Sequence, residues 1–258
     1  MKIALVGYGK MGHMIEAIAL KRGNQIVATI DSYASDATCK TKTVDELVQA
    51  VKNSGAEVVI EFTHPDVVLK NIQALLPLGI PLVIGTTGWN AQIEKVKEWV
   101  KETNGSLFYA ANYSIGVNLF YKIVYEAAAL LNDFDEYDTA LWEAHHNQKA
   151  DSPSGTALEI ARQVMKAQPK KTELVTDAFH SKPEPQQLHV SSTRVGSVPG
   201  THTVYFDSLA DTIELTHTAR SREGFALGAV RAAEWITLGL KEGTLEKGLT
   251  FTMTDLLH

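Results

Sequence analysis

The chain has 258 residues, 45% of them hydrophobic and 21% charged, a composition typical of a globular protein and not of a disordered, collagen-like or disulfide-rich one. Its 30 acidic and 24 basic residues give a formal charge of −6, which argues against nucleic acid or an anionic membrane as the main partner. Cys39 is the single cysteine, so no disulfide forms within the chain. No apolar run approaches the ~18 residues of a membrane helix, and no secretory signal is recognisable. We therefore expect a cytoplasmic protein.

The first part of the chain alternates between apolar runs and stretches with helical periodicity. The pattern predicts strands at residues 3–6, 25–31, 58–62, 81–84 and 107–111, with helices at residues 14–20, 65–78 and 91–102 between them. The strands are continuous apolar runs, which is typical of a parallel sheet covered on both faces. We therefore predict an α/β fold in which residues 1–112 form a Rossmann-type doubly wound parallel sheet.

After Asn112 this alternation ends, and a second domain is expected. The pattern predicts helices at residues 115–131 and 156–167, a strand at 137–145, a loop at 168–187, strands of an antiparallel meander at 188–194, 201–206 and 212–219, and a final helix at 225–240. Residues 113–222 are therefore expected to form a central α+β domain with a mostly antiparallel or mixed sheet. Periodicity does not say which domain the last helix joins.

A glycine-rich segment lies between the first predicted strand and the first predicted helix. It fits the pattern G-x-G-x-x-G, in which the glycines allow a tight turn, the approach of a pyrophosphate to the backbone, and close packing of helix and strand. Asp31 ends the second strand, where an acid accepts hydrogen bonds from the ribose hydroxyls of adenosine. The sequence therefore predicts a dinucleotide site formed by Gly7, Tyr8, Gly9, Lys10, Met11, Gly12 and Asp31.

The acid at position 31 also bears on which dinucleotide is used. It repels a 2′-phosphate, and the neighbouring Ser32 brings no positive charge, so NADH is favoured over NADPH. NADPH stays possible because Lys10 could reach a 2′-phosphate. Two further loops follow parallel strands, at whose carboxyl ends ligands of such sheets bind. They are expected to line the nicotinamide half of the site with Gly85, Thr86, Thr87, Ala110, Ala111, Asn112 and Tyr113.

Residues 141–156 hold the densest group of polar side chains. Ser152 is placed to cap the following helix, with Pro153 at its first position. The N–H groups of the residues that come next would then bind an anion. These residues are Ser154, Gly155 and Thr156.

The same segment carries groups that suit proton transfer. His145, His146 and Lys149 add positive charge, and histidine exchanges protons near neutral pH. With the adjacent helix N-terminus they suit a substrate that bears carboxylates. No metal site is expected, because neighbouring strand residues point to opposite sides and no third ligand has suitable spacing.

Several segments resemble those of one enzyme family, in the same order along the chain. They are GYGKMG at residues 7–12, IGTTG at 84–88, AANYSIGVN at 110–118, EAHHNQKADSPSGTA at 143–157 and RVGSVPGTHT at 194–203. The family is that of the dihydrodipicolinate reductases, also called 4-hydroxy-tetrahydrodipicolinate reductases, of lysine and diaminopimelate biosynthesis. The resemblance is nearly end to end, and the string around His145 is its most specific part.

The resemblance implies a reaction and roles for the matching residues. Hydride would pass from reduced nicotinamide to C4 of a cyclic imine with two carboxylates, and protonation of the resulting enamine would give tetrahydrodipicolinate. His145 matches the family's proton donor and acceptor, and Lys149 its proton donor. The residues that match substrate contacts are His146, Gly155 and Thr156, with Ser154 assisting.

The resemblance also implies an architecture. The nucleotide domain would be completed by residues 223–258, and residues 113–222 would bind substrate and form a homotetramer through their sheets. Many members have one more residue in the glycine loop, and many carry Glu-Arg in place of Asp31-Ser32. The second difference removes a partner for a 2′-phosphate and favours NADH.

Two other functions stay open at this stage. Another two-domain nicotinamide-dependent dehydrogenase, such as an aspartate dehydrogenase, would explain the glycine loop but not the set of His145, His146 and Lys149. A nicotinamide-binding sensor without catalytic activity would be expected to lack such proton-transfer residues.

Overall fold

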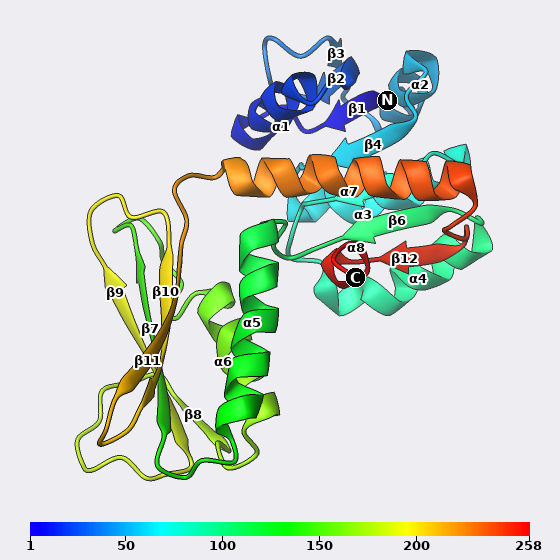
Figure 1. Ribbon diagram of the computed structural model, residues 1–258. Coiled ribbons are helices and arrows are strands. Elements are labelled where there is room, and N and C mark those ends of the chain that lie inside the picture. Colours follow the sequence, from blue (N-terminus) through cyan, green and yellow to red (C-terminus); the bar gives the residue numbers. More distant parts are fainter. The chain divides into compact units, whose positions relative to one another are not determined.

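The computed structural model describes residues 1–258, which divide into two compact units (Figure 1). The first unit combines Met1–Ile115 with Glu223–His258, and the second is Gly116–Arg222. The division follows Ile115 rather than the expected Asn112. Tyr113 belongs to the first unit because its ring is 2% exposed and its hydroxyl donates to the carbonyl oxygen of Ile84 at 2.8 Å.

The first unit alternates strands and helices, as expected. In chain order its elements are β1 (Lys2–Val6), α1 (Lys10–Lys21), β2 (Gln25–Asp31), β3 (Cys39–Lys40), α2 (Val44–Ser54), β4 (Val58–Glu61), α3 (Pro65–Leu75), η1 (Leu76–Leu78), β5 (Leu82–Ile84), η2 (Asn90–Gln92), α4 (Ile93–Glu102), β6 (Ser106–Tyr109), α7 (Glu223–Glu242), β12 (Leu249–Phe251) and α8 (Met253–Leu256). No helix of the chain combines the length and the apolar character needed to cross a membrane.

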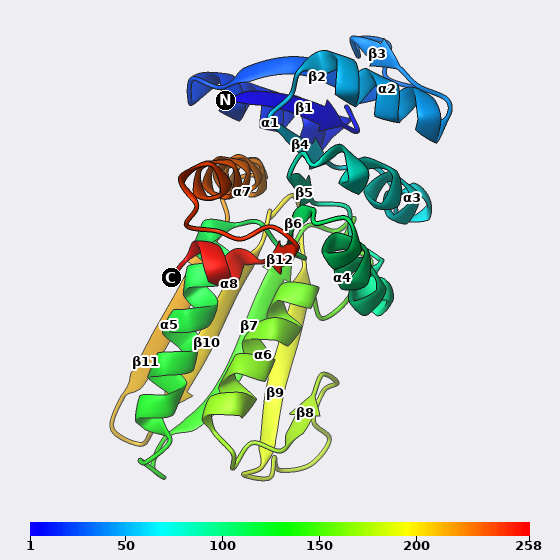
Figure 2. The ribbon, with the colours of Figure 1, turned by 90° about the vertical axis from the view of Figure 1, so that its right-hand side faces the viewer.

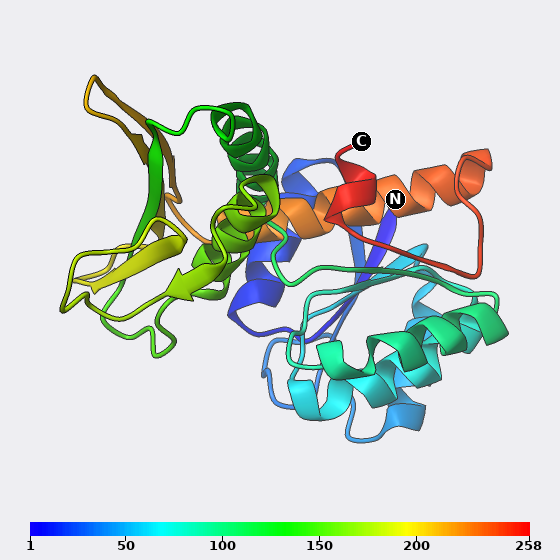
Figure 3. The same cartoon turned by 90° about the horizontal axis from the view of Figure 1, so that it is seen from below.

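All neighbouring strands of this unit pair in parallel, in the order β12-β6-β5-β4-β1-β2-β3. Side chains alternate between two cores: Ile3 and Leu5 join one, and Ala4 and Val6 the other. The first core contains residues of α1, α7 and α8, and the second contains residues of α2, α3 and α4, so helices cover both faces (Figure 3). This is the doubly wound parallel sheet that the sequence predicts.

Four elements of this unit were missing from the sequence prediction: β3, α2, β12 and α8. The most substantial is α2, which starts with a capping box in which Thr43 accepts the N–H of Glu46 and Glu46 accepts the N–H of Thr43. It buries Leu47 and Val51 against the sheet and ends at Gly55 in the left-handed conformation. The strands β3, β12 and the single-turn helix α8 are too short to produce a clear period.

The second unit packs two helices on one face of a mixed sheet (Figure 2). Its elements are α5 (Ile115–Leu131), which starts at the last residue of the first unit, β7 (Asp138–His145), α6 (Gly155–Ala167), β8 (Glu173–Val175), β9 (Gln187–Arg194), β10 (Thr201–Asp207) and β11 (Thr212–Thr218). The strand order is β11-β10-β7-β9-β8.

The expected antiparallel meander was wrong in one respect. The strands β10 and β11 form an antiparallel hairpin, but β9 pairs in parallel with β7, and β7 lies between β9 and β10. The crossover helix α6 joins β7 to β9 and covers the sheet, which makes this pairing a β-α-β unit. The stretch expected to be a loop, residues 168–187, contains the short strand β8.

Candidate functional site

The glycine loop of the first unit follows β1 and leads into α1. Gly7 has φ +91°, and a Cβ added there would lie 2.0 Å from the carbonyl oxygen of Phe62. A Cβ on Gly12 would lie 2.6 Å from the carbonyl oxygen of Gly7. At Gly9, in contrast, a Cβ would meet nothing within 4 Å. The first and third glycines are therefore required by the fold, whereas the second faces open space where a ligand's phosphates could approach the backbone.

Asp31 lies at the end of β2 and connects three backbone segments. Its Oδ2 accepts the N–H of Tyr8 at 2.8 Å, and its Oδ1 accepts the N–H groups of Tyr33 and Ala34 at 2.7 and 2.9 Å. Partial burial raises the pKa of Asp31, but these hydrogen bonds outweigh it and hold the pKa below its usual value.

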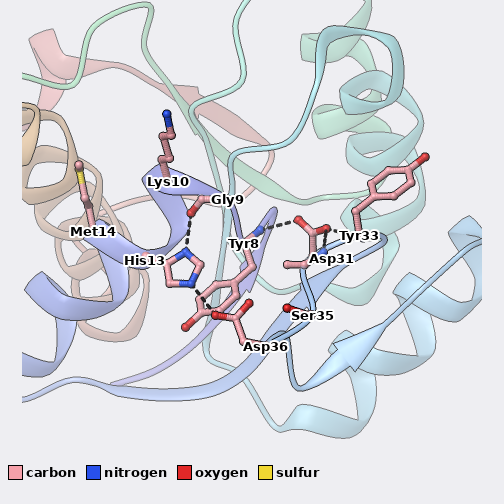
Figure 4. Close-up of a pocket in the computed structure, with 10 residues that line it drawn as sticks. Tyr8, Gly9, Lys10, His13, Met14, Asp31, Tyr33, Ser35 and Asp36 are labelled. Carbon is pink, nitrogen blue, oxygen red and sulfur yellow. Dashed lines mark hydrogen bonds and ion pairs between the residues drawn. The ribbon is translucent and has the colours of Figure 1, made fainter.

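A pocket of about 960 Å³ lies beside this loop (Figure 4). It is lined by Tyr8, Gly9, Lys10, His13, Met14, Asp31, Tyr33, Ala34, Ser35 and Asp36. Of the predicted cofactor residues, Tyr8, Gly9, Lys10 and Asp31 line it, while Gly7, Met11 and Gly12 do not. The remaining lining residues were not predicted.

His13 and Asp36, both missed by the sequence prediction, connect the two sides of this pocket. The Nδ1 of His13 lies 2.8 Å from the carbonyl oxygen of Gly9, and its Nε2 lies 2.8 Å from Oδ2 of Asp36 (Figure 4). The imidazole also stacks on the ring of Tyr8. The hydrogen bond that His13 donates to Asp36 raises the pKa of His13. In the sequence, the only signal for His13 is that it directly follows Gly12, the last glycine of the loop.

Together these features fit a dinucleotide. The N-cap of α1 is Gly9, which has no side-chain cap, so the helix N-terminus is open to a negatively charged group. The carboxylate of Asp31 is ionised and stands beside the loop, as expected for a partner of ribose hydroxyls.

The two further loops expected at the cofactor lie at the ends of β5 and β6. Gly85 faces the ring of Phe62, where a Cβ would come within 1.9 Å of the ring. Thr86 is buried and Thr87 exposed; Ala110 and Asn112 are partly buried, and Ala111 is exposed. The buried side chains of Thr86 and Tyr113 hold the two loops in place.

Thr86 belongs to a buried polar network around Glu61 at the end of β4. Oε2 of Glu61 accepts from the hydroxyl of Thr86 at 2.8 Å, and Oε1 accepts from Asn71 at 3.1 Å and from the hydroxyl of Thr63. Thr86 in turn accepts the N–H of Thr63 at 2.7 Å. Glu61 therefore connects the backbone after β4 to the loop after β5. Burial raises the pKa of Glu61, and the hydrogen bonds oppose this only in part.

This raised pKa predicts a pH-dependent stability. A folded-state pKa above the unfolded value of about 4.3 gives a stabilising contribution that is complete below that value and is lost as the pH rises through the folded pKa. The free energy of unfolding of the wild type should therefore fall relative to that of Glu61→Gln across this window. Urea titrations at several pH values measure the difference. Glu98→Gln, at an exposed position of α4, is the control, and a Glu61→Gln difference independent of pH would contradict the assignment.

The second unit gathers polar side chains on the face of its sheet that packs against α5 and α6. Along β7 the residues on this face are Leu141, Glu143 and His145, so an apolar face becomes polar toward the strand end. Glu143 pairs in register with Ser192 on β9 and with His202 on β10, and His145 pairs with Arg194 on β9.

Glu143 is completely buried at the centre of this cluster. Its Oε1 accepts from the N–H of Ser154 at 2.9 Å, from the hydroxyl of Ser192 at 2.8 Å and from Nη2 of Arg194 at 2.9 Å. Burial would raise the pKa of Glu143, but the nearby imidazole of His202 and the hydrogen bonds from Ser154 and Arg194 hold it well below its usual value. The carboxylate is therefore ionised at neutral pH.

His145 lies beside this carboxylate and is 8% exposed. Its Nδ1 is 3.1 Å from Oε2 of Glu143, and its ring meets that of His202 edge-on at 5.1 Å between centroids. A Cβ on Gly200 would lie 2.9 Å from Nε2 of His145, so only glycine fits there. Burial lowers the pKa of His145 to about 4, aided by the neighbouring His202, Lys149 and Arg194 and opposed by Glu143. His145 is therefore neutral near pH 7.

The N-cap of the helix after this cluster lies two residues later than expected. Ser154, not Ser152, is the N-cap of α6, and its side chain accepts the N–H of Ala157 at 3.1 Å. Gly155 and Thr156 are the first residues of the helix, where N–H groups point along the axis toward an anion. The N–H of Ser154 is already bonded to Glu143, so Ser154 organises the site rather than presenting this group to a ligand.

The loop between β7 and α6 carries the remaining predicted residues. Nζ of Lys149 lies 2.7 Å from Oδ1 of Asp151, and its side chain is partly buried. His146 is half-buried and directly follows the end of β7. The structure thus brings His145, Ser154 and Lys149 into one region, with His146 beside them in the chain. It adds Glu143, Arg194 and His202, which the sequence prediction did not assign.

The same cluster contains side chains that could act as ligands of a metal ion. Ligand atoms of Glu143, His145 and His202 lie within 4.8 Å of one another, so the partner of His145 is His202 and not the adjacent His146. Arg194 donates to the same carboxylate at 2.9 Å and already balances its charge. A cation there would lie beside that guanidinium, which disfavours it.

Comparison with known proteins finds relatives over nearly the whole chain. The family description "Dihydrodipicolinate reductase, N-terminus" matches residues 1–113, and "Dihydrodipicolinate reductase, C-terminus" matches residues 116–257. A relative from Christiangramia forsetii, named 4-hydroxy-tetrahydrodipicolinate reductase, is 37% identical over 257 residues, covering 100% of this chain and 98% of its own. A relative of the same name from Archaeoglobus fulgidus is 35% identical, with 100% of both chains covered.

A solved structure shares the fold. The dipicolinate-bound dihydrodipicolinate reductase from a Paenisporosarcina species matches with a TM-score of 0.76 and 20% sequence identity, covering 98% of this chain and 97% of that chain. This likeness supports the two-unit fold with its parallel and mixed sheets.

Proposed function

The chain belongs to the dihydrodipicolinate reductase family, and we propose that it reduces the dihydrodipicolinate-type cyclic imine, formed from 4-hydroxy-tetrahydrodipicolinate, to tetrahydrodipicolinate. The observation that carries the proposal is the cluster of Glu143, His145 and His202 beside the N-terminus of α6, within the segment that carries the family resemblance. In this region an anion site, the N-terminus of α6, lies beside side chains that can transfer protons.

The first unit would hold the nicotinamide cofactor. Gly9 and the N-terminus of α1 bind the pyrophosphate, and Asp31 accepts from the adenosine ribose. The loops that include Thr86 and Asn112 position the nicotinamide end. When bound, the reduced cofactor supplies a hydride for C4 of the substrate.

The second unit would hold the substrate and supply the proton. N–H groups of Gly155 and Thr156 and the side chain of His146 bind the carboxylates. Lys149 exchanges Asp151 for a substrate carboxylate and donates the proton that the enamine takes up. His145, neutral at rest, accepts and returns protons through its imidazole. The step balances as one hydride and one proton added to the ring system.

A coupled assay tests this function. The preceding synthase, fed with pyruvate and aspartate semialdehyde, generates the substrate, and the absorbance of NADH is followed after this protein is added. We expect synthase-dependent oxidation of NADH, and of NADPH to a smaller extent. Oxidation of neither cofactor, with an active synthase, would refute the proposal.

We propose NADH as the favoured cofactor because of the residues that follow β2. Asp31 presents a negative charge where a 2′-phosphate would lie, and the hydroxyl of Ser32 donates to the carbonyl oxygen of Thr41 at 2.7 Å. Two lysines border this region: Lys10 lines the pocket, and Nζ of Lys42 donates to the carbonyl oxygen of Ser32 at 3.0 Å.

Ser32→Arg should therefore change the preference. A guanidinium can form a charge-assisted pair with a 2′-phosphate, worth about 1.5–3 kcal/mol, and should lower the KM for NADPH about 10-fold or more. The KM for NADH should change little. Steady-state kinetics with both cofactors measure the ratio, and Ser35→Arg, elsewhere in the pocket lining, is the matched control. An unchanged ratio in Ser32→Arg would contradict the assigned position of the 2′-phosphate.

The assembly and location follow from the same family membership. We propose a homotetramer formed through the sheet face of the second unit that no helix covers. Trp142 and Tyr205 lie there on strand positions opposite in direction to the core residues Leu141 and Val204. A biosynthetic reductase that draws on cellular NADH would work in the cytoplasm, with a small dicarboxylate as its partner and neither nucleic acid nor membrane.

The two alternative functions are not favoured. An amino-acid dehydrogenase would leave the cluster around Glu143 and His145 without a role, and the family matches cover both units. A sensor without catalytic activity would not need Lys149 and His145 together. Turnover of a simple amino acid with NAD, and none of the cyclic imine, would reverse this preference.

A further inference from the structure

Glu143 has no role in the reaction described so far, although it is the most deeply enclosed charge of the second unit. Its side chain is 0% exposed, and the three donors Ser154, Ser192 and Arg194 all contact one carboxylate oxygen, Oε1. These donors come from the start of α6 and from β9. They hold Oε1 in place, and none of them contacts the second oxygen, Oε2.

That second oxygen faces two imidazoles. Oε2 of Glu143 lies 3.1 Å from Nδ1 of His145 and 3.5 Å from Nε2 of His202, and it makes no aligned hydrogen bond. Nδ1 of His145 likewise has no other hydrogen-bond partner. A buried ionised oxygen without a donor is costly, and the nearest N–H that can reach it is that of His145. Such contacts often tighten only when substrate is bound.

We propose that Glu143 is a positioning residue that holds His145 in the tautomer with the proton on Nδ1 and the lone pair on Nε2. The inference rests on the proposed function, in which His145 moves protons at the substrate. In a neutral imidazole one nitrogen carries the proton, and a carboxylate beside Nδ1 selects that nitrogen. Nε2, which lies on the side of Gly200, is then the basic atom.

The anchoring of Oε1 makes one substitution especially informative. In Glu143→Gln the amide can present either its oxygen or its nitrogen to the three donors. Only the oxygen accepts hydrogen bonds, so it takes the position of Oε1, and the NH₂ group turns toward His145 and His202. Nδ1 of His145 must then accept, which moves the imidazole proton to Nε2. The variant keeps the shape of the site and reverses the tautomer.

The test combines kinetics with nitrogen-15 NMR of histidine-labelled protein. The His145 signals are assigned by comparison with His145→Gln. We expect protonated Nδ1 in the wild type and protonated Nε2 in Glu143→Gln. We also expect kcat to fall ~10²–10⁴-fold, as a carboxylate-to-amide change does in a Ser-His-Asp triad, with the KM for NADH unchanged. The control is Glu136→Gln, at an exposed position before β7.

Two results would overturn the proposal: a wild-type His145 that carries its proton on Nε2, or an unchanged tautomer and kcat in Glu143→Gln. If Glu143→Gln does not fold, the wild-type spectrum alone still decides, because it reports which nitrogen is protonated. Absence of reductase activity in the wild type would refute the proposed function, whereas the tautomer measurement would still establish or refute the role of Glu143.

Discussion

Lys149→Ala should lower kcat by ~10²–10⁴-fold, which is the usual contribution of a general acid. Lys149 is partly buried and is held by Asp151 at 2.7 Å, in the same region as His145. Removing it deletes the proposed proton donor and one cationic partner of the substrate carboxylates. The affinity for NADH should stay within about twofold, because the proposed cofactor residues lie in the other unit.

Stopped-flow kinetics with saturating NADH and fluorescence titration of NADH separate the two effects. The matched control is Lys182→Ala, which removes the same charge from an exposed loop of the second unit and should leave both quantities unchanged. A large loss of NADH affinity with unchanged kcat would contradict the assigned role of Lys149. It would place this side chain at the cofactor instead.

Two substitutions in the glycine loop should separate stability from cofactor binding. Gly7→Ala should lower the free energy of unfolding by about 2–5 kcal/mol, because its Cβ would overlap the carbonyl oxygen of Phe62 and its φ of +91° is strained for alanine. Gly9→Ala should cost about 1 kcal/mol or less, because its φ is −85° and its Cβ meets open space. It should nevertheless weaken NADH binding about 10–100-fold, by obstructing the pyrophosphate.

Urea unfolding and NADH titration of both variants measure these effects. Each variant serves as the control for the other, since both add one methyl group to the same loop. Normal NADH affinity in Gly9→Ala would show that the pyrophosphate does not approach this face of the loop. A fully stable Gly7→Ala would contradict the tight contact between this loop and the backbone of Phe62, which directly follows β4.

Most of the first unit could be predicted from the sequence because its strands are continuous apolar runs separated by helices. The helix α2 had a readable signal, since Thr43 and Glu46 form the capping box and Leu47 and Val51 recur at helical spacing. The strands β3 and β12 are held by pairing with β2 and β6, which short local patterns do not reveal.

The sheet of the second unit was harder to predict because strand order depends on contacts between distant segments. Alternating residues identified β9, β10 and β11, but alternation says nothing about which strand lies beside which. Placing α6 between β7 and β9 was the available clue, since a helical crossover is typical of parallel pairing. The N-cap of α6 is Ser154 rather than the expected Ser152, and the backbone N–H of Ser154 also donates to Glu143.

The candidate site was predictable where its residues are close in the chain and missed where the sheet assembles them. His145 and Lys149 stand in one dense polar segment. Arg194 and His202 are brought to Glu143 only through the register of β9 and β10 with β7. The sequence did carry a signal for these two residues. Arg194 and His202 stand at even spacing from the core residues of their own strands, so alternation places them on the same face as the core.

The central claim is that this chain transfers a hydride to the substrate ring, and isotope labelling tests it most directly. The synthase-coupled reaction is run with NADH carrying two deuterium atoms at C4 of the nicotinamide, and the product is analysed by mass spectrometry and NMR. We predict one deuterium per molecule of tetrahydrodipicolinate, located at C4 of the ring. A product without deuterium, or NADH that binds and is never oxidised in the presence of the substrate, would contradict the account.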